Sequence, residues 1–174
     1  MTGAARHHRH SIRLRGYDYA QTGAYFVTVC AQDRACLFGD VIDGVMRLND
    51  SGRIAADEWT RSGTLRTEIA IDEWVVMPNH VHGIVVITGG DARRGDRPVA
   101  PTPGPRPRSL GAMIAGFKSA ATTRINEQRG TPGAPVWQRN YYEHIVRDED
   151  DLNRIRQYIR ENPAHWASDR ENPG

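Results

Sequence analysis

Two histidines, His80 and His82, stand two residues apart in a β-prone stretch and could bind one metal ion. Side chains at positions i and i+2 of a strand point to the same face, roughly 6 to 7 Å apart along the chain, so Val81 faces the opposite layer. Neutral imidazole is a common metal ligand, and a buried imidazole without a partner is unfavourable. Spacing alone leaves two interpretations open: a metal site, or half-buried histidines satisfied by hydrogen bonds.

A tyrosine and an asparagine one helical turn apart, Tyr158 and Asn162, form a second candidate pair. Their i, i+4 spacing places both on one face of a helix, with Cβ atoms about 6 Å apart. A phenol and an amide oxygen could then act on the same small region. The structural alternative is that Tyr158 is an amphipathic core residue and that Asn162 ends the helix before Pro163.

The elements that position these four residues follow from the apolar patterns along the chain. β-Prone runs occupy residues 24–32, 68–77, 80–87 and 141–146, while helical patterns cover residues 51–61 and begin again after Ser109 and Asp148. The order strand, helix, strand, strand, helix, strand matches the ferredoxin-like split βαβ arrangement. We therefore predict an α+β fold, an antiparallel sheet covered by helices, with a further C-terminal helix over residues 148–162 that carries Tyr158.

Length and composition are typical of one folded domain. The chain has 174 residues, of which 39% are hydrophobic and 25% charged. No stretch approaches the roughly 18 apolar residues that span a bilayer, and the N-terminus lacks the apolar segment of a signal peptide. We expect a cytoplasmic protein without a membrane partner. Cys30 and Cys36 form no CxxC motif, and we assign them no chemistry.

Basic residues are unevenly distributed, although the net charge is only +2. Residues 1–16 hold four arginines and no acid, which predicts a basic N-terminal arm. Residues 89–108 are rich in Gly, Pro and Arg, which predicts a mobile surface loop within the single domain, 1–174. These stretches favour a phosphate-binding face. Because the chain has only one lysine, genomic base composition is a competing explanation for the arginines.

Three segments together resemble a known family: WVVMPNHVHGIVVI, SLGAMIAGFKSAATTRIN and VWQRNYYEHIVRDEDDLNRIRQYIRENP. In order and spacing they closely resemble the HUH single-tyrosine transposases, in particular the REP-associated tyrosine transposases. The resemblance covers about residues 17–166, and the long insertion at 89–108 departs from it. It implies that His80 and His82 are the family's histidine pair, that Tyr158 is the nucleophile, and that Asn162 is the third ligand of Mg²⁺ or Mn²⁺.

The resemblance also implies the reaction and the partner. Such an enzyme cuts and rejoins single-stranded DNA near REP-like hairpins through a covalent 5′-phosphotyrosine. Tyr141 and Tyr142 are rival nucleophiles, but apolar residues, not amides, stand four positions after them. Candidate DNA-contacting residues are Arg13, Arg15, Lys118, Arg124, Arg139, His144 and Arg147. Trp137, Tyr141 and Tyr142 would suit base stacking.

Other functions stay open at this stage. One is a domesticated protein that binds hairpins without cutting them, although the intact set of four residues argues against it. Another is a hydrolase that uses an HxH metal site and water as the nucleophile. A replication initiator or relaxase with HUH chemistry fits the length and the order of motifs poorly. The sequence leaves monomer and dimer equally open.

Overall fold

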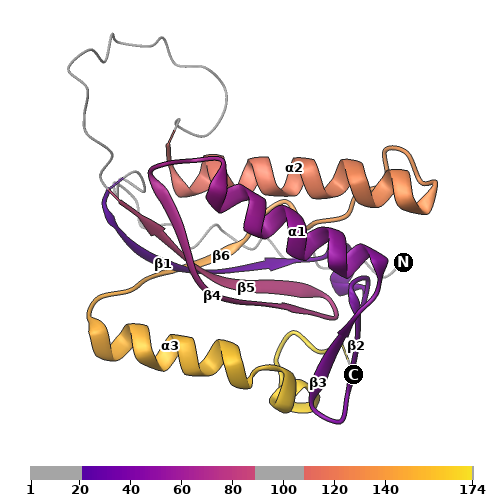
Figure 1. The fold of residues 1–174 in the computed structure, drawn as a ribbon. Helices are drawn as coiled ribbons and strands as arrows, with labels where there is room; N and C mark the ends of the chain where they lie inside the picture. The colour runs from indigo at the N-terminus through magenta and orange to yellow at the C-terminus, as the bar shows by residue number, and fades with distance from the viewer. Residues whose placement is uncertain (1–20, 89–107, 174) are drawn as a thin grey trace, which may run out of the picture.

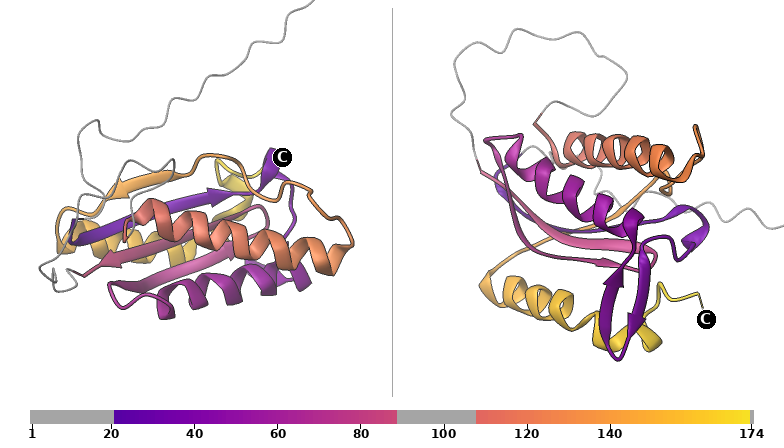
Figure 2. Two further views of the ribbon diagram at one scale, coloured as in Figure 1. Left: turned by 90° about the horizontal axis from the view of Figure 1, so that it is seen from above. Right: turned by 45° about the vertical axis from the view of Figure 1, so that its right-hand side comes forward.

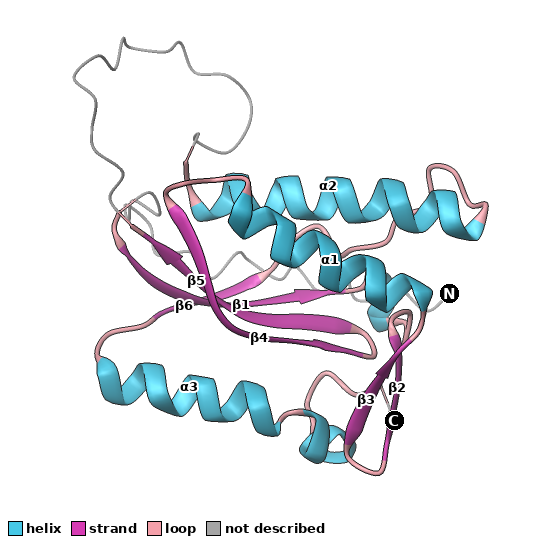
Figure 3. Cartoon of the chain, viewed as in Figure 1, coloured by secondary structure: helices cyan, strands magenta, loops and turns pink. Residues whose placement is uncertain are grey.

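The computed structural model describes residues 21–88 and 108–173 and contains an α+β domain (Figures 1 and 3). Its elements in chain order are β1 Gly23–Cys30, η1 Gln32–Arg34, β2 Gly39–Ile42, β3 Val45–Leu48, α1 Asp50–Thr64, β4 Ile69–Met77, β5 His80–Ile87, α2 Leu110–Arg129, β6 Tyr142–Ile145, α3 Glu149–Glu161 and η2 Pro163–Ser168. The predicted arm, 1–16, and all of the predicted loop except Arg108 lie outside the described residues.

The central sheet has the strand order β4-β5-β1-β6, and every neighbouring pair is antiparallel. Helices α1 and α2 lie on one face of this sheet and α3 lies on the other (Figures 1 and 2). Without the small β2–β3 ribbon, the order of elements is β-α-β-β-α-β followed by a helix. The predicted fold class is therefore confirmed, including the additional C-terminal helix.

Two local predictions were wrong. The segment GDVIDG, residues 39–44, has a turn-like composition, but residues 39–48 form the antiparallel β2–β3 ribbon. Asp43 and Gly44 both take positive φ values, 53° and 72°, which suit a two-residue hairpin turn. Helix α1 begins one residue before the expected Ser51 and extends to Thr64. Its N-cap is Asn49, whose side chain accepts the Gly52 N–H at 2.9 Å.

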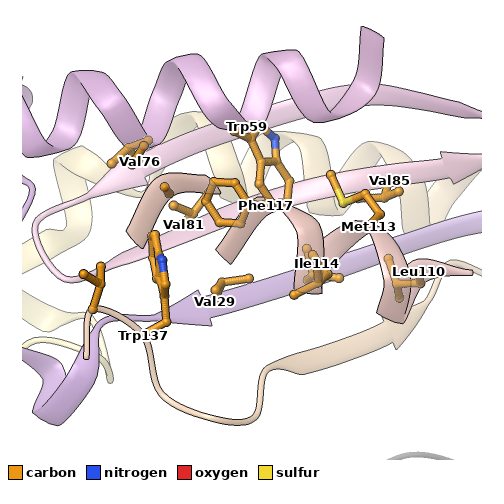
Figure 4. Packing of buried hydrophobic residues seen from close by; sticks show 14 of the residues in the cluster. Val29, Trp59, Val76, Val81, Val85, Leu110, Met113, Ile114, Phe117 and Trp137 are labelled. Carbon is orange, nitrogen blue, oxygen red and sulfur yellow. The ribbon is translucent and has the colours of Figure 1, made fainter. Parts of the chain in front are cut away.

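The main core lies between the sheet and helices α1 and α2 (Figure 4). The ring of Phe117 on α2 lies 5.0 Å from Trp59 on α1 and 5.1 Å from Trp137, centroid to centroid. Val81 of β5 faces this core, as alternation predicts. Gly83 lies directly beneath Trp59, and a Cβ there would overlap the indole ring. Trp137 is only 7% exposed, so the prediction that it stacks on bases was wrong.

The second apolar cluster lies on the opposite face and is smaller. Phe26 and Ile84 of the sheet pack against Ile155 and Ile159 of α3. These contacts fix the helix that carries Tyr158 over the strands that carry the histidines. None of the helices within residues 21–88 and 108–173 has both the length and the apolar character needed to cross a bilayer.

Candidate active site

Strand β5 brings His80 and His82 to the face of the sheet that α3 covers. His82 pairs with Thr28 and His80 with Cys30 on β1, and both imidazoles are buried, at 2% and 0% exposure. Their ring centroids are 4.3 Å apart. The two side chains converge on one small region, as their spacing predicts, while Val81 between them belongs to the opposite core.

The side chain of Asn79 fixes the tautomer of His80. The Asn79 amide nitrogen donates to the backbone carbonyls of Arg34 at 3.2 Å and Glu171 at 2.6 Å, so its Oδ1 is an acceptor. His80 Nδ1 therefore donates to Oδ1, at 2.8 Å, and Nε2 carries the lone pair. Burial lowers the pKa of His80 to about 4, against an opposing effect of Asp169. The neutral ring presents Nε2, which is buried and has no hydrogen-bond partner among the described residues.

His82 lies between a threonine and the candidate tyrosine. Its Nδ1 is 2.9 Å from Thr28 Oγ1, and its Nε2 is 3.3 Å from the hydroxyl of Tyr158. Burial, and then the neighbouring His80, lower the pKa of this imidazole well below its ordinary value. Both histidines are therefore neutral near pH 7, which is the state that binds a metal ion.

Helix α3 presents Tyr158 beside the histidines. Its N-terminus is capped by Asp148, whose side chain accepts the Asp151 N–H at 2.8 Å. The Tyr158 ring is 42% exposed and lies 5.3 Å from the His82 ring and 6.0 Å from Phe26, centroid to centroid. Burial of the hydroxyl raises the pKa of Tyr158, and Asp169 adds to the effect. The phenol is thus protonated at neutral pH, and its ring is reachable from solvent.

Asn162 ends α3 at the bottom of the same region and is 2% exposed. Its Nδ2 donates to Asp169 Oδ2 at 2.9 Å, whereas its Oδ1 is buried without a hydrogen-bond partner in the described part of the chain. Against the dominant effect of burial, the Asn162 amide raises the pKa of His80 and lowers that of Tyr158. The structure thus brings together all four residues that the sequence singled out.

Sequence reasoning missed two residues of this region. Asp169 offers a carboxylate oxygen that, with one nitrogen each of His80 and His82, forms a group of potential ligands within 4.8 Å of one another. No motif marks Asp169, which lies in an irregular segment after η2. Asn79 was not singled out, although its position directly before His80 was the signal available.

The donor set fits a divalent cation. Two neutral imidazoles, an amide oxygen and a carboxylate oxygen are the mixed nitrogen and oxygen ligands that Mn²⁺ accepts, and Mg²⁺ favours the oxygens. Buried polar atoms without partners are rare in folded proteins and call for an explanation such as a bound ion. Among the residues that the structure describes, His80 Nε2 and Asn162 Oδ1 are two such atoms in one site.

The predicted DNA-contacting residues are scattered. Arg13 and Arg15 lie outside the described residues. Lys118 is largely turned inward: its Nζ donates to the backbone carbonyls of residues 138–140 at 2.8 to 3.3 Å, and burial lowers its pKa to about 8. Arg124 is 2.7 Å from Glu58 in a salt bridge between α2 and α1. Both side chains therefore have structural partners within the domain.

His144, Arg139 and Arg147 lie nearer the surface. Arg139 and Arg147 are exposed, and His144 Nε2 is 2.9 Å from Asp151 Oδ2. A surface pocket of about 260 Å³ at the start of α3 is lined by His144, Arg147, Asp148, Asp150, Asp151 and Arg154. Its acidic and basic groups are mixed, so charge alone does not make it a phosphate site.

The two rival tyrosines differ in position. Tyr142 is 40% exposed and pairs with Thr28, the β1 residue that also pairs with His82, so it shares the face of the site. Tyr141 packs against the main core, where Lys118 Nζ lies 5.7 Å from its ring centroid. Tyr158, by contrast, has its hydroxyl 3.3 Å from His82 Nε2.

Comparison with known proteins gives a family and a fold. No family model matches the sequence. Over 168 residues the chain is 38% identical to an uncharacterized protein of Haemophilus influenzae, and the match covers 94% of this chain and 92% of that one. The chain belongs to the family of this Haemophilus protein.

Among solved structures, the chain is similar to a REP-associated tyrosine transposase bound to a REP hairpin. The TM-score is 0.60 at 21% identity, over 88% of this chain and 73% of the other. At that identity the similarity establishes the fold and nothing finer. This chain, a member of the family of the Haemophilus protein, therefore has the fold of the REP-associated transposase. The resemblance found in the sequence is confirmed for the fold.

Proposed function

We propose that the chain is a transposase: a metal-dependent enzyme that cuts and rejoins single-stranded DNA near hairpins through a phosphotyrosine on Tyr158. The proposal rests on two buried acceptor atoms, His80 Nε2 and Asn162 Oδ1, which find no hydrogen-bond partner within residues 21–88 and 108–173 and lie close to Tyr158. A purely structural role for these four residues does not explain why the two acceptor atoms are buried together in one small region.

His80, His82 and Asn162 would hold the cation, either Mg²⁺ or Mn²⁺. When bound, it supplies positive charge that polarises a phosphodiester and stabilises its leaving oxygen. The chain provides the rest of the site. Asn79 holds the His80 ring so that Nε2 faces inward, and Thr28 contacts the outer nitrogen of His82. Outer contacts of this kind orient metal-binding imidazoles.

Tyr158 would act as the nucleophile. Its Oη forms a bond to the phosphorus while the bond from phosphorus to the 3′-oxygen breaks. The phenol proton passes to solvent, and the leaving oxygen takes up a proton and becomes a 3′-hydroxyl. The product is a 5′-phosphotyrosine. Attack by a 3′-hydroxyl on this ester runs the reaction in reverse: the phosphorus–3′-oxygen bond forms again and Tyr158 leaves. Strands are thus rejoined without an external energy source. The raised pKa of Tyr158 explains why the phenol needs nearby positive charge to react.

The expected substrate is single-stranded DNA that contains a REP-like hairpin, met in the cytoplasm. The solved transposase of similar fold is bound to a REP hairpin, which supports this class of partner. On this chain, Tyr142 is exposed on the same face as His82 and could stack on a base near the cut site. Exposed Arg139 and Arg147 would contact phosphates.

The test is cleavage of end-labelled hairpin-bearing single strands, analysed on denaturing gels with Mn²⁺, with Mg²⁺ and with EDTA. The wild-type protein should cut only with a divalent cation. Tyr158→Phe should bind the DNA and the metal as before and should not cut, because it lacks one hydroxyl. His80→Ala should lose metal-dependent cutting, and circular dichroism should show that it remains folded.

Two outcomes would replace the proposal with another function. Tight hairpin binding without cleavage under any condition would identify a DNA-binding protein that does not cut. Metal-dependent cleavage that survives in Tyr158→Phe would identify a hydrolase that uses water as its nucleophile.

A further inference from the structure

The segment after η2, residues 169–172, returns to the end of the sheet and borders the candidate metal site (Figure 1). It carries an acid, Asp169, whose carboxylate lies with the two histidines in one group of potential ligands. The three ligands proposed above, His80, His82 and Asn162, are all neutral. A cation bound only by neutral groups at a buried site lacks a compensating negative charge.

Contacts with the β1–β2 connection hold this segment in place. Arg34 Nη2 lies 3.2 Å from Glu171 Oε2, and Arg34 Nη1 donates to the Arg170 carbonyl at 3.3 Å. The Glu171 carboxylate is buried and also accepts from Cys30 Sγ at 3.6 Å. The Glu171 N–H donates to Asp169 Oδ1 at 2.7 Å. Asp169 is therefore positioned by an anchored loop.

Asn79 and Asn162 connect the segment to the candidate ligands. The amide of Asn79 accepts from His80 through Oδ1 and donates to the Glu171 carbonyl through Nδ2, so one side chain sets both the His80 tautomer and the path of the segment. On the other side, Asp169 Oδ2 accepts the Asn162 Nδ2–H at 2.9 Å. Because that bond uses the amide nitrogen, Asn162 Oδ1 stays available, and it has no hydrogen-bond partner among the described residues.

We propose that Asp169 is the anionic ligand of the metal site and that it also holds the Asn162 amide with Oδ1 toward the histidines. Each carboxylate oxygen accepts one hydrogen bond in this structure and keeps a further lone pair for a cation. The irregular segment after η2 is then part of the active site. This proposal rests on the metal site of the proposed function.

The test is Mn²⁺ binding to the metal-free full-length protein, measured by isothermal titration calorimetry without DNA. Asp169→Asn keeps an oxygen that can accept from Asn162 but removes the charge, and Asp169→Ala removes both. We expect Asp169→Asn to weaken Mn²⁺ binding about 10-fold to 100-fold, and Asp169→Ala to weaken it at least as much. Glu161→Gln is the matched control, since it removes an exposed charge next to Asn162, and it should bind as the wild type does.

The outcomes separate this proposal from the proposed metal site. If the wild type and His80→Ala bind Mn²⁺ equally, or neither binds, the metal site itself is wrong. If His80→Ala loses binding while both Asp169 variants keep the wild-type affinity, Asp169 is not a ligand and only the present proposal is overturned. If Glu161→Gln weakens Mn²⁺ binding as much as Asp169→Asn does, the loss reflects the lower negative charge of the region. The assignment of Asp169 as a ligand is then wrong.

Discussion

The two faces of the central sheet are built for different tasks. Beneath α1 and α2 the side chains are apolar and interlocked, with Phe117 between two tryptophans (Figure 4). Beneath α3 a small apolar cluster borders two histidines and a buried asparagine. Because side chains alternate along a strand, Val81 serves the first face and His82 the second. The fold can thus hold unsatisfied polar atoms on one face while the other provides most of the stability.

The attachment of α3 differs from that of the other helices. At a register shift in β4, between Ile71 and Trp74, the side chains of Asp72 and Glu73 both face α3. Arg156 donates to both oxygens of Asp72, at 2.9 and 2.6 Å, and Arg160 lies 2.6 Å from Glu73. Ion pairs therefore supplement a modest apolar contact. We therefore expect substitutions on the two faces to have separable effects on stability and on the site.

The largest expected effect is on the apolar face. Phe117→Ala should lower the free energy of unfolding by about 3 to 5 kcal/mol, because it leaves a cavity between Trp59 and Trp137. Urea unfolding measures this change. The molecules that remain folded should keep the Mn²⁺ affinity of the wild type. A large loss of affinity would contradict the separation of the two faces.

Acid should destabilise the protein through the buried histidines on the other face. In metal-free protein the pKa of His80 is lowered from 6.5 to about 4, so between these values the unfolded chain binds a proton that the folded chain does not. Stability is therefore complete above pH 6.5 and falls as the pH drops toward 4, by on the order of 3 kcal/mol for this residue. Urea unfolding in EDTA across this range tests it. His80→Gln should make the slope smaller, with the contribution of His82, whose pKa is also lowered, remaining. An unchanged slope would contradict the assignment.

Mn²⁺ should stabilise the wild-type protein through the same face. At a free concentration of 100 times the dissociation constant, a ligand that binds only the folded state adds about 2.7 kcal/mol. We expect a matching rise in the denaturation midpoint of the wild type and of Phe117→Ala, but none in His80→Ala. Equal stabilisation of all three proteins would place the metal elsewhere.

The smallest effect on global stability is expected from the attachment of α3. Asp72→Asn weakens the bidentate pair with Arg156, and we expect it to lower the free energy of unfolding by about 1 kcal/mol or less, since both side chains are partly exposed. Amide hydrogen exchange in α3 should become faster while exchange in α2 stays unchanged. Asp50→Asn, which weakens the more exposed pair with Arg53 on α1, is the control and should leave α3 unaffected.

Local patterns predicted most of the fold. The β-prone composition of β5 and the helical spacing of apolar residues in α2 identify these two elements from local sequence alone. The β2–β3 ribbon was missed although Asp43-Gly44 is a common hairpin pair, since its strands have only four residues each and leave Ile42 and Val45 exposed.

The site was only partly accessible from the sequence. His80 with His82, and Tyr158 with Asn162, have spacings that strand and helix geometry convert into shared faces. Asp169 follows an irregular turn, where no period links position to direction, and its approach to His80 depends on long-range contacts of Arg34 and Asn79. The inward orientation of Lys118 could not be predicted from the sequence either, because its hydrogen-bond acceptors are backbone carbonyls of a segment about 20 residues away.

The most direct test of the account is to identify the residue that becomes attached to DNA. Wild-type protein would be incubated with a hairpin-bearing single strand and Mn²⁺, the covalent adduct trapped by denaturation, and its peptides mapped by mass spectrometry. We expect attachment at Tyr158, on the face that holds the histidines. A DNA-linked peptide with the attachment at Tyr141 or Tyr142, or metal-dependent cutting with no adduct at all, would contradict it.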